Sequence, residues 1–271
     1  MTVFDAERVR GDCSPVFEPS RRALIAGTAA ASIATFMPSR SLFAQPLPGI
    51  YRFKVGAADI TVLSDGAMEL PVNVMLPRRA QSAIDSLFTQ AGQTFSNLTA
   101  QINVAIIKLG TEVILIDTGG GPDFMPTLGK LSDRMEAAGI KPDTITRVIF
   151  THAHPDHLWG VIDPLGGGTL FEKAEHVMSS VEFEFWIKAD VDTRVPVAFR
   201  GMAVGTHRRL KAIADRIKTI APRTEIAPGV HVVDTSGHTP GHLSVMVRSE
   251  TEQLLIGGVE SPAEGMKVKV Q

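Results

Sequence analysis

The 271-residue chain contains eight histidines, and five of them fall into two short clusters. The first cluster is Thr151-His152-Ala153-His154-Pro155-Asp156-His157, which brings four potential metal ligands together in one short stretch. Imidazole and carboxylate groups are good ligands for zinc and similar divalent ions. An ion held in this way lowers the pKa of bound water to about 7. The cluster therefore predicts metal-dependent hydrolytic chemistry, and the alternative of a loop of solvated histidines is disfavoured.

The backbone around this first cluster explains how its side chains converge. The residues from Arg147 to Phe150 are typical of a short buried strand, and the cluster follows them directly. In extended backbone, residues two apart point the same way, so His152 and His154 can hold one ion together. Pro155 cannot continue a regular strand ladder and turns the chain. We expect this turn to direct the last two ligands of the cluster to a neighbouring position.

The second cluster is Ser236-Gly237-His238-Thr239-Pro240-Gly241-His242, which also follows an expected strand. A catalytic zinc site needs three protein ligands and an open position, and a ligand from a separate loop would complete that number. Alone this cluster is only suggestive, whereas together with the first it strongly indicates a metal site. Cys13 is the only cysteine, so cysteine-based zinc sites and an intramolecular disulfide are excluded.

The composition is that of a globular protein with room for one large domain or two modest ones. Hydrophobic residues make up 44% and charged residues 21% of the chain. These values exclude a disordered chain, a collagen-like fibre and a coiled coil. The formal net charge of −2 gives no electrostatic argument for binding nucleic acid. We therefore expect no nucleic acid among its partners, and a small-molecule substrate is implied only by the family resemblance given below.

The N-terminal segment has the features of an export signal. Ser20-Arg21-Arg22 precedes a short apolar, alanine-rich stretch, and Leu42-Phe43-Ala44 resembles a cleavage region. The arginine pair favours twin-arginine export, which predicts a periplasmic or secreted protein without stable membrane anchoring after cleavage. A retained anchor helix and an ordinary Sec signal are the alternatives. We assign residues 1–44 to the signal, 45–260 to the folded domain and 261–271 to a tail.

The folded domain is expected to be a layered α/β sandwich, because strands and helices alternate in pairs along it. The expected strands are Tyr51 to Val55, Ile60 to Leu63, Ile102 to Leu109, Glu112 to Ile116, Arg147 to Phe150, Ala174 to Ser179, Val230 to Asp234, Ser244 to Val247 and Gln253 to Ile256. The expected helices cover residues 80–91, 122–139, 181–187 and 210–220.

The combined motifs resemble the metallo-β-lactamase superfamily from about residue 50 to residue 258. The likeness lies in His-x-His-x-Asp-His after a strand, Ile116-Asp117-Thr118-Gly119 before it, and Gly-His-Thr-Pro-Gly-His after it. This resemblance implies an αββα sandwich with metals, typically zinc, at the strand ends. A carboxylate such as Asp117 would steady the metal ligands.

The resemblance also implies a role for each histidine of the two clusters. His152, His154 and His238 would bind one metal, while Asp156 and His157 would help to bind a second. His242 would be structural or would support the ligands. We therefore expect one zinc ion, or two divalent ions, at this centre.

Within the superfamily, the chain is most similar to methyl parathion hydrolase-like proteins. Leu63-Ser64-Asp65-Gly66 and Pro126-Thr127-Leu128-Gly129 carry this likeness. By position, the resemblance implies an aromatic substrate pocket lined by Phe124, Trp186 and Phe199. Ordinary core packing is an equal alternative for any one of them. Trp159 stands where the family usually has glycine, which would narrow the mouth of the site.

The sequence departs from the family at its later strands. The family has a bridging aspartate in a Gly-Asp step, but this chain has Gly257-Gly258-Val259, and Glu260 comes one place late. No histidine or aspartate occurs from Leu243 to Gln271. We therefore expect the C-terminal elements of the αββα sandwich to be missing and the second metal position to be incomplete. Apolar surface left exposed in this way would favour a homodimer.

Together these features predict an exported metal-dependent hydrolase of ester, lactone or phosphotriester substrates. A metal-bound hydroxide would attack the substrate, and Asp156 would orient this nucleophile. Loss of the bridging aspartate and the C-terminal histidine is expected to impair activity. One alternative is a catalytically inactive remnant that binds a metal or ligand. Another is a glyoxalase or sulfatase branch of the same fold.

The first prediction concerns metal content. The purified mature protein should hold at most about one zinc ion per chain, because only three histidines form a complete ligand set. Elemental analysis after dialysis against metal-free buffer measures this ratio. Two tightly held ions per chain would contradict the prediction.

Overall fold

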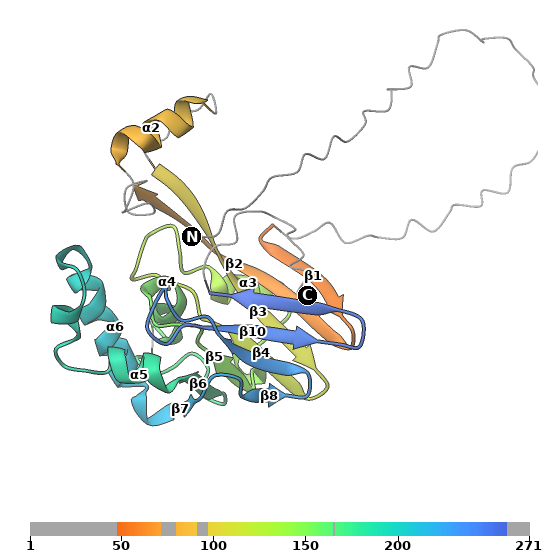
Figure 1. Cartoon of the computed structure of the whole chain (residues 1–271). Coiled ribbons are helices and arrows are strands. Elements are labelled where there is room, and N and C mark those ends of the chain that lie inside the picture. The colour runs from red at the N-terminus through yellow and green to blue at the C-terminus, as the bar shows by residue number, and fades with distance from the viewer. Residues whose placement is uncertain (1–47, 72–79, 91–96, 165, 259–271) are drawn as a thin grey trace, which may run out of the picture. The chain divides into compact units, whose positions relative to one another are not determined.

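A computed structural model describes residues 48–71, 80–90, 97–164 and 166–258. The predicted export signal and the predicted tail lie outside the described residues. The described part contains two β-sheets with helices beside them (Figure 1). No helix in this part is both long and apolar enough to cross a membrane.

The larger sheet has seven strands in chain order. The first four strands pair antiparallel, and the pairs from β4 to β7 are parallel. Parallel neighbours need crossover connections, and helices occupy those connections here. The strands are β1 (Ile50–Val55), β2 (Ala58–Pro71), β3 (Asn97–Leu109), β4 (Glu112–Ile116), β5 (Arg147–Ile149), β6 (Glu175–Ser179) and β7 (Ile217–Ile220).

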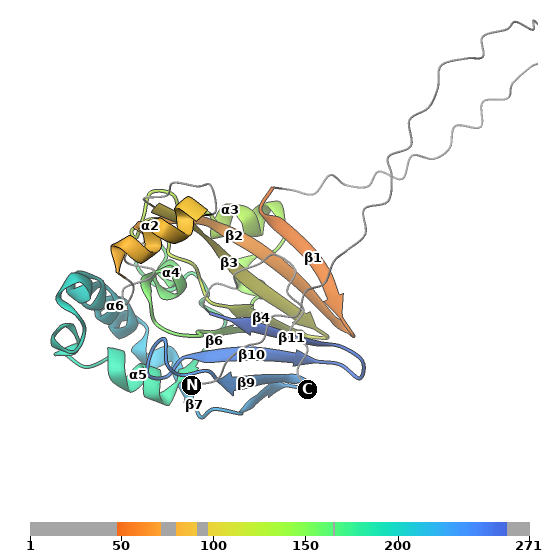
Figure 2. The ribbon, with the colours of Figure 1, turned by 45° about the horizontal axis from the view of Figure 1, so that its top comes forward.

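The smaller sheet is antiparallel, with the strand order β11-β10-β9-β8. Figure 2 shows β9, β10 and β11 beside the strands of the larger sheet. The four strands are β8 (Glu225–Ala227), β9 (Val230–Asp234), β10 (Leu243–Arg248) and β11 (Gln253–Gly257). All strands expected from the sequence are present, whereas β7 and β8 were not expected as strands.

Five α-helices are described, together with short 3-10 turns. The α-helices are α2 (Gln81–Gln90), α3 (Leu131–Ala137), α4 (Pro155–Leu158), α5 (Ser180–Trp186) and α6 (Arg200–Ala212). The 3-10 turns are η1 (Pro142–Thr144), η2 (Trp159–Val161), η3 (Val191–Arg194), η4 (Val197–Phe199) and η5 (Ala214–Arg216). The expected helices over 80–91 and 181–187 are confirmed as α2 and α5.

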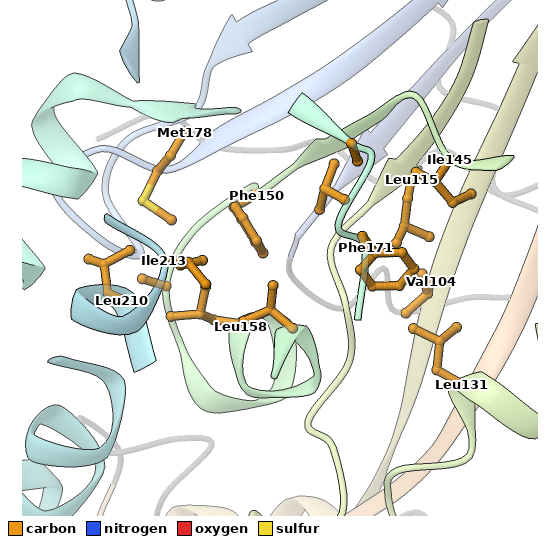
Figure 3. Close-up of a cluster of buried hydrophobic side chains, with 14 of the residues drawn as sticks. Val104, Leu115, Leu131, Ile145, Phe150, Leu158, Phe171, Met178, Leu210 and Ile213 are labelled. Atoms are coloured by element: carbon orange, nitrogen blue, oxygen red, sulfur yellow. The ribbon is translucent and has the colours of Figure 1, made fainter. Parts of the chain in front are cut away.

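The two faces of the larger sheet bury two different cores. Leu115 of β4 packs in a cluster that also includes side chains of α3, α4 and α6 (Figure 3). Its neighbours Ile114 and Ile116 point the other way and pack against β9 and β10 of the smaller sheet. This alternation follows from the period of two along a strand. The described part is therefore an α/β sandwich with two sheets face to face, as predicted.

The expected helix over residues 122–139 is wrong in its first half, because α3 begins only at Leu131. The buried carboxylate of Asp65, on β2, accepts hydrogen bonds from the backbone N–H groups of Gly129 and Leu131. Gly129 also has a φ of 81°, in the left-handed region that interrupts a right-handed helix. Tertiary hydrogen bonding therefore overrides the helical spacing of the apolar residues.

The expected helix over residues 210–220 is also wrong. Helix α6 ends at Ala212, and Ile217–Ile220 forms β7 instead. This strand pairs in parallel with β6, with Ile217 opposite His176. The two isoleucines and the threonine of β7 are β-branched and suit a sheet better than a helix. The apolar spacing alone did not distinguish these two outcomes.

The second prediction tests the carboxylate that holds the segment before α3. Replacing Asp65 with alanine leaves the N–H groups of Gly120, Gly129 and Leu131 without this acceptor, and the hydrogen bonds from Gly120 and Leu131 are buried. We expect Asp65→Ala to lower the free energy of unfolding by about 3 kcal/mol. Urea unfolding followed by circular dichroism measures the change.

The matched control for this prediction is Asp59→Ala on the same strand. Asp59 pairs with Lys54 at the surface, and its side chain is 54% exposed. Exposed ion pairs contribute little, so the midpoint should barely move. Equal effects of the two substitutions would contradict the assigned role of Asp65.

Candidate metal centre

The candidate site lies where three loops leave the ends of strands. Asp117 follows β4, the segment 151–157 follows β5, and His238 lies in the loop between β9 and β10. Because β4 and β5 are parallel neighbours, their carboxyl ends meet at one edge of the larger sheet. Such an edge is a common location for ligand sites in α/β proteins. The smaller sheet brings its loop to the same edge.

Three of the predicted ligands converge. One nitrogen from each of His152, His154 and His238 lies within 4.8 Å of the other two. Nε2 of His238 is 2.9 Å from Nδ1 of His154. The ring centroids of His152 and His238 are 4.8 Å apart. We call these three residues the histidine triad.

The electrostatics of the triad suit a metal ion. Burial lowers the pKa of His152 well below its ordinary value. Burial and the neighbouring His238 lower the pKa of His154 to about 4, and burial also lowers that of His238. The three imidazoles are therefore neutral at pH 7, which is the form that binds metals. Three neutral nitrogen donors facing one another fit the zinc ion expected from the sequence.

Asp117 supports the triad through Thr151. Its Oδ1 accepts a hydrogen bond from the Thr151 backbone N–H at 2.7 Å, and its Oδ2 accepts one from the Thr151 hydroxyl at 2.8 Å. That hydroxyl oxygen is 3.1 Å from Nδ1 of His152. Asp117 adopts a φ of 62°, which is uncommon for a residue with a side chain. The uncommon backbone conformation of Asp117 and its two hydrogen bonds fix its carboxylate against Thr151, next to His152.

Asp156 and His157 do not join the triad. Nε2 of His157 lies 2.9 Å from Oδ2 of Asp156, and its Nδ1 lies 2.9 Å from Oδ2 of Asp117. Although burial alone would lower it, the two carboxylates raise the pKa of His157 to about 10. Burial opposes ionisation of Asp156, yet its pKa falls to about 2 because of His157. Asp117, His157 and Asp156 therefore form a chain of ionic hydrogen bonds beside the triad, and the last two of these side chains are only partly buried.

Gly258 lies where the resemblance leads us to look for a bridging aspartate. A Cβ atom built at this glycine would lie 3.1 Å from Nδ1 of His152 and would overlap the Thr151 hydroxyl. The backbone at Gly258 therefore packs directly against the triad. No carboxylate occupies this position, as the sequence indicates.

The three predicted pocket aromatics lie in different environments. Trp186 is 4% exposed, and its ring contacts that of His154 edge-on at 5.7 Å. Phe124 is half-buried and packs edge-on against Trp159 at 5.4 Å. Phe199 is 38% exposed at the start of α6. Among the described residues, Phe199 makes no ring contact with either of the other two, so the shared pocket stays a prediction.

Trp159 borders a groove on the side of α6. The groove has a volume of about 450 Å³, and the guanidinium of Arg209 lies 3.9 Å from the centroid of the Trp159 ring. Arg209 also pairs with Asp123 at 2.6 Å. The groove is lined by Asp123, Trp159, Gly201, Val204, Gly205, Arg208 and Arg209. Trp159 therefore packs along α6 and forms one wall of an open groove.

The sequence analysis missed Glu182. This residue is fully buried on α5, and its carboxylate contacts both histidine-bearing loops. The signal for it was weak but present, because Glu182 and Trp186 are four residues apart and so share one face of a mostly apolar helix. His242 is 1% exposed, with Nδ1 2.7 Å from the Thr235 hydroxyl, in keeping with a supporting role.

Comparison with known families gives one match. The sequence profile of the Metallo-beta-lactamase superfamily matches residues 99–258. The chain is also 23% identical over 177 residues to the N-acyl homoserine lactonase AiiB of Agrobacterium fabrum strain C58. That alignment covers 56% of this chain and 59% of the lactonase. The chain thus spans well under two thirds of the curated lactonase that it matches.

Two solved structures are similar over most of the chain. AidC, a dizinc quorum-quenching lactonase in complex with a homoserine product, superposes with a TM-score of 0.69 and 25% identity. The hydrolase AbOPH of the beta lactamase superfamily superposes with a TM-score of 0.66 and 26% identity. Each alignment covers 78% of this chain and 74% of the other.

The third prediction tests the triad. His238→Ala should abolish tight zinc binding, because a zinc site with an open position needs three protein ligands. The matched control is His231→Ala on β9, whose ring lies outside the triad, with Nε2 3.9 Å from Glu225. Isothermal titration with zinc compares the two variants. Retained tight binding in His238→Ala would exclude the triad as the metal site.

Proposed function

This chain belongs to the metallo-β-lactamase superfamily, and on that basis we propose that it is a metal-dependent hydrolase of ester, lactone or phosphotriester substrates. The predicted fold class, the α/β sandwich of this superfamily, is confirmed. The observation that carries the proposal is the convergence of three neutral imidazoles at the strand ends. This ligand set is typical of catalytic rather than purely structural zinc sites.

The histidine triad would hold the metal. A divalent ion there, such as zinc, would act as a Lewis acid and lower the pKa of water to about 7. The chain's own residues supply orientation. Asp156 is ionised and lies in α4, two residues after His154, so it would accept a hydrogen bond from the attacking water and direct it. His157 keeps this carboxylate ionised, and Asp117 holds His157 in place.

The lactone part of the substrate proposal is supported by the similarity to AiiB and AidC, both named as lactonases. The phosphotriester part rests on the likeness to methyl parathion hydrolase-like proteins. A flat, apolar leaving group would suit Phe124, Trp186 and Phe199 if these line one pocket. Trp159, which packs against Phe124 and lines the groove beside α6, offers further aromatic surface.

An impaired or inactive protein is the second candidate, and Gly258 is the observation that favours it. The backbone there contacts Thr151 and His152 and carries no carboxylate to bridge two ions. We propose that one ion is held tightly and that hydrolysis is slower than in a two-ion enzyme. The extreme case is a remnant that binds a metal or ligand without turnover.

Location and assembly complete the proposal. The arginine pair before an apolar stretch supports export to the periplasm or beyond the cell. We propose no nucleic-acid partner and no stable membrane anchoring after cleavage, and we propose association into a homodimer. Sedimentation of the mature protein and fractionation of cells test these two points.

The fourth prediction tests hydrolysis and its dependence on metal. The zinc-loaded chain should hydrolyse N-acyl homoserine lactones or paraoxon-like phosphotriesters, and EDTA should remove that activity until zinc is restored. Asp156→Asn should lower kcat by about 100-fold, because a positioned acid or base group typically contributes at least that factor.

The control for this experiment is Asp133→Asn, which changes an exposed aspartate on α3. Its kcat should equal that of the unmodified chain. Turnover that survives chelation would contradict the metal-dependent mechanism. No turnover by the zinc-loaded chain on either substrate class would identify the inactive remnant instead.

A further inference from the structure

The buried carboxylate of Glu182 accepts hydrogen bonds from both loops that carry the histidine triad. Oε1 of Glu182 accepts hydrogen bonds from the Ala153 backbone N–H at 3.0 Å and from the Trp186 indole N–H at 2.7 Å. Oε2 accepts from the Thr239 hydroxyl at 2.8 Å and from the Gly241 backbone N–H at 2.9 Å. The side chain is completely shielded from solvent. Each carboxylate oxygen therefore accepts two hydrogen bonds from other groups of the protein.

Three of the four donors to Glu182 lie close to the histidines of the triad in the sequence. Ala153 lies between two triad residues, His152 and His154, on the loop that follows β5 of the larger sheet. Thr239 is the next residue after the third ligand, His238, and Gly241 lies two residues further along the same loop between β9 and β10. A single side chain from α5 thus connects ligands supplied by two different sheets.

We propose that Glu182 is a positioning residue that fixes the distance between His238 and the His152–His154 pair. This inference rests on the proposed metal centre, because it concerns the distances between the metal ligands of that centre. Groups that hold metal ligands in place commonly change metal affinity when they are replaced.

The surrounding contacts restrict the spacing further. The Ala153 carbonyl accepts a hydrogen bond from the Thr206 hydroxyl of α6 at 3.2 Å, and that hydroxyl accepts one from the Trp159 indole at 3.0 Å. Ala153, the residue between two ligands, is therefore held by α5 through its N–H group and by α6 through its carbonyl. A Cβ atom at Gly241 would overlap the backbone of Glu182, so this loop packs directly on α5.

Only a carboxylate of this length can satisfy the four donors. A glutamine has one acceptor oxygen, and its NH2 group would face two hydrogen-bond donors. An aspartate is one methylene shorter and would not reach both loops. Buried donors left without an acceptor are costly, so the loops would move to find other partners. Such movement would change the spacing of the triad.

The experiment compares Glu182→Gln with Glu184→Gln in the full chain. Glu184 is exposed on the same helix and has no assigned role at the site. Co²⁺ alone is the probe, because its visible absorption reports the number and geometry of its ligands. We expect Glu182→Gln to weaken Co²⁺ binding by about 10- to 100-fold and to change its absorption bands. Glu184→Gln should match the unmodified chain in both respects.

A second variant, Thr239→Val, tests the inference even if Glu182→Gln does not fold. Thr239→Val removes one donor and keeps the carboxylate, so it should bind Co²⁺ several-fold more weakly, with a smaller spectral change. If Glu182→Gln folds and matches Glu184→Gln in affinity and spectrum, the inference is overturned. If Glu182→Gln does not fold, an unchanged Co²⁺ spectrum and affinity in Thr239→Val overturn it instead.

Amide exchange of the metal-free protein separates this inference from the proposed function. Failure of the unmodified chain to bind Co²⁺ would overturn the proposed metal centre. Loss of protection at both Ala153 and Gly241 in Glu182→Gln would still support the tie between the two loops. Unchanged protection at these amides would overturn that tie, whatever the outcome with metal.

Discussion

The packing of the smaller sheet against the larger one is the contact on which the candidate site depends. The triad takes two ligands from the loop after β5 and one from the loop between β9 and β10. Apolar side chains from both sheets form the shared core, among them Ile149 of β5 and Val232 of β9. At the edge of that core, the Leu243 backbone N–H donates to the Thr151 carbonyl at 2.8 Å. The sheet interface therefore ends in a direct hydrogen bond between the two ligand-bearing segments.

Three buried carboxylates then fix the loops that the interface brings together. Asp65 accepts hydrogen bonds from the backbone N–H groups of Gly129 and Leu131, before and at the start of α3. Asp117 accepts one from the N–H of Thr151, and Glu182 accepts one each from the N–H groups of Ala153 and Gly241. Burial raises the pKa of Asp65 and of Glu182, and backbone donors oppose that rise in both cases. A buried carboxylate is tolerated only where donors replace the lost water. The backbone N–H groups of these loops therefore replace the water that the three carboxylates lose on burial.

Several features were predictable because they depend on local sequence. In extended backbone the side chains of residues two apart point the same way, so the proximity of His152 and His154 could be predicted. Most strands could be predicted from runs of β-branched residues. The end of α6 and the start of β7 were not predictable in this way, because parallel pairing with β6 decides them. Glu182 was missed for a similar reason. Its role arises from donors more than twenty residues away, and nothing in its own helix specifies those partners.

The charges of the side chains explain why Asp156 and His157 do not behave like the histidine triad. The triad consists of neutral imidazoles that face one another, and no carboxylate of the described residues forms an ion pair with them. Asp156 and Asp117, in contrast, are already neutralised in part by His157, which lies between them. A cation entering there would have to break two short ionic hydrogen bonds before gaining new ones. With Gly258 in place of a bridging carboxylate, no further oxygen donor at that position offsets the loss. This arrangement of charges supports the proposal of a single tightly held ion at the triad.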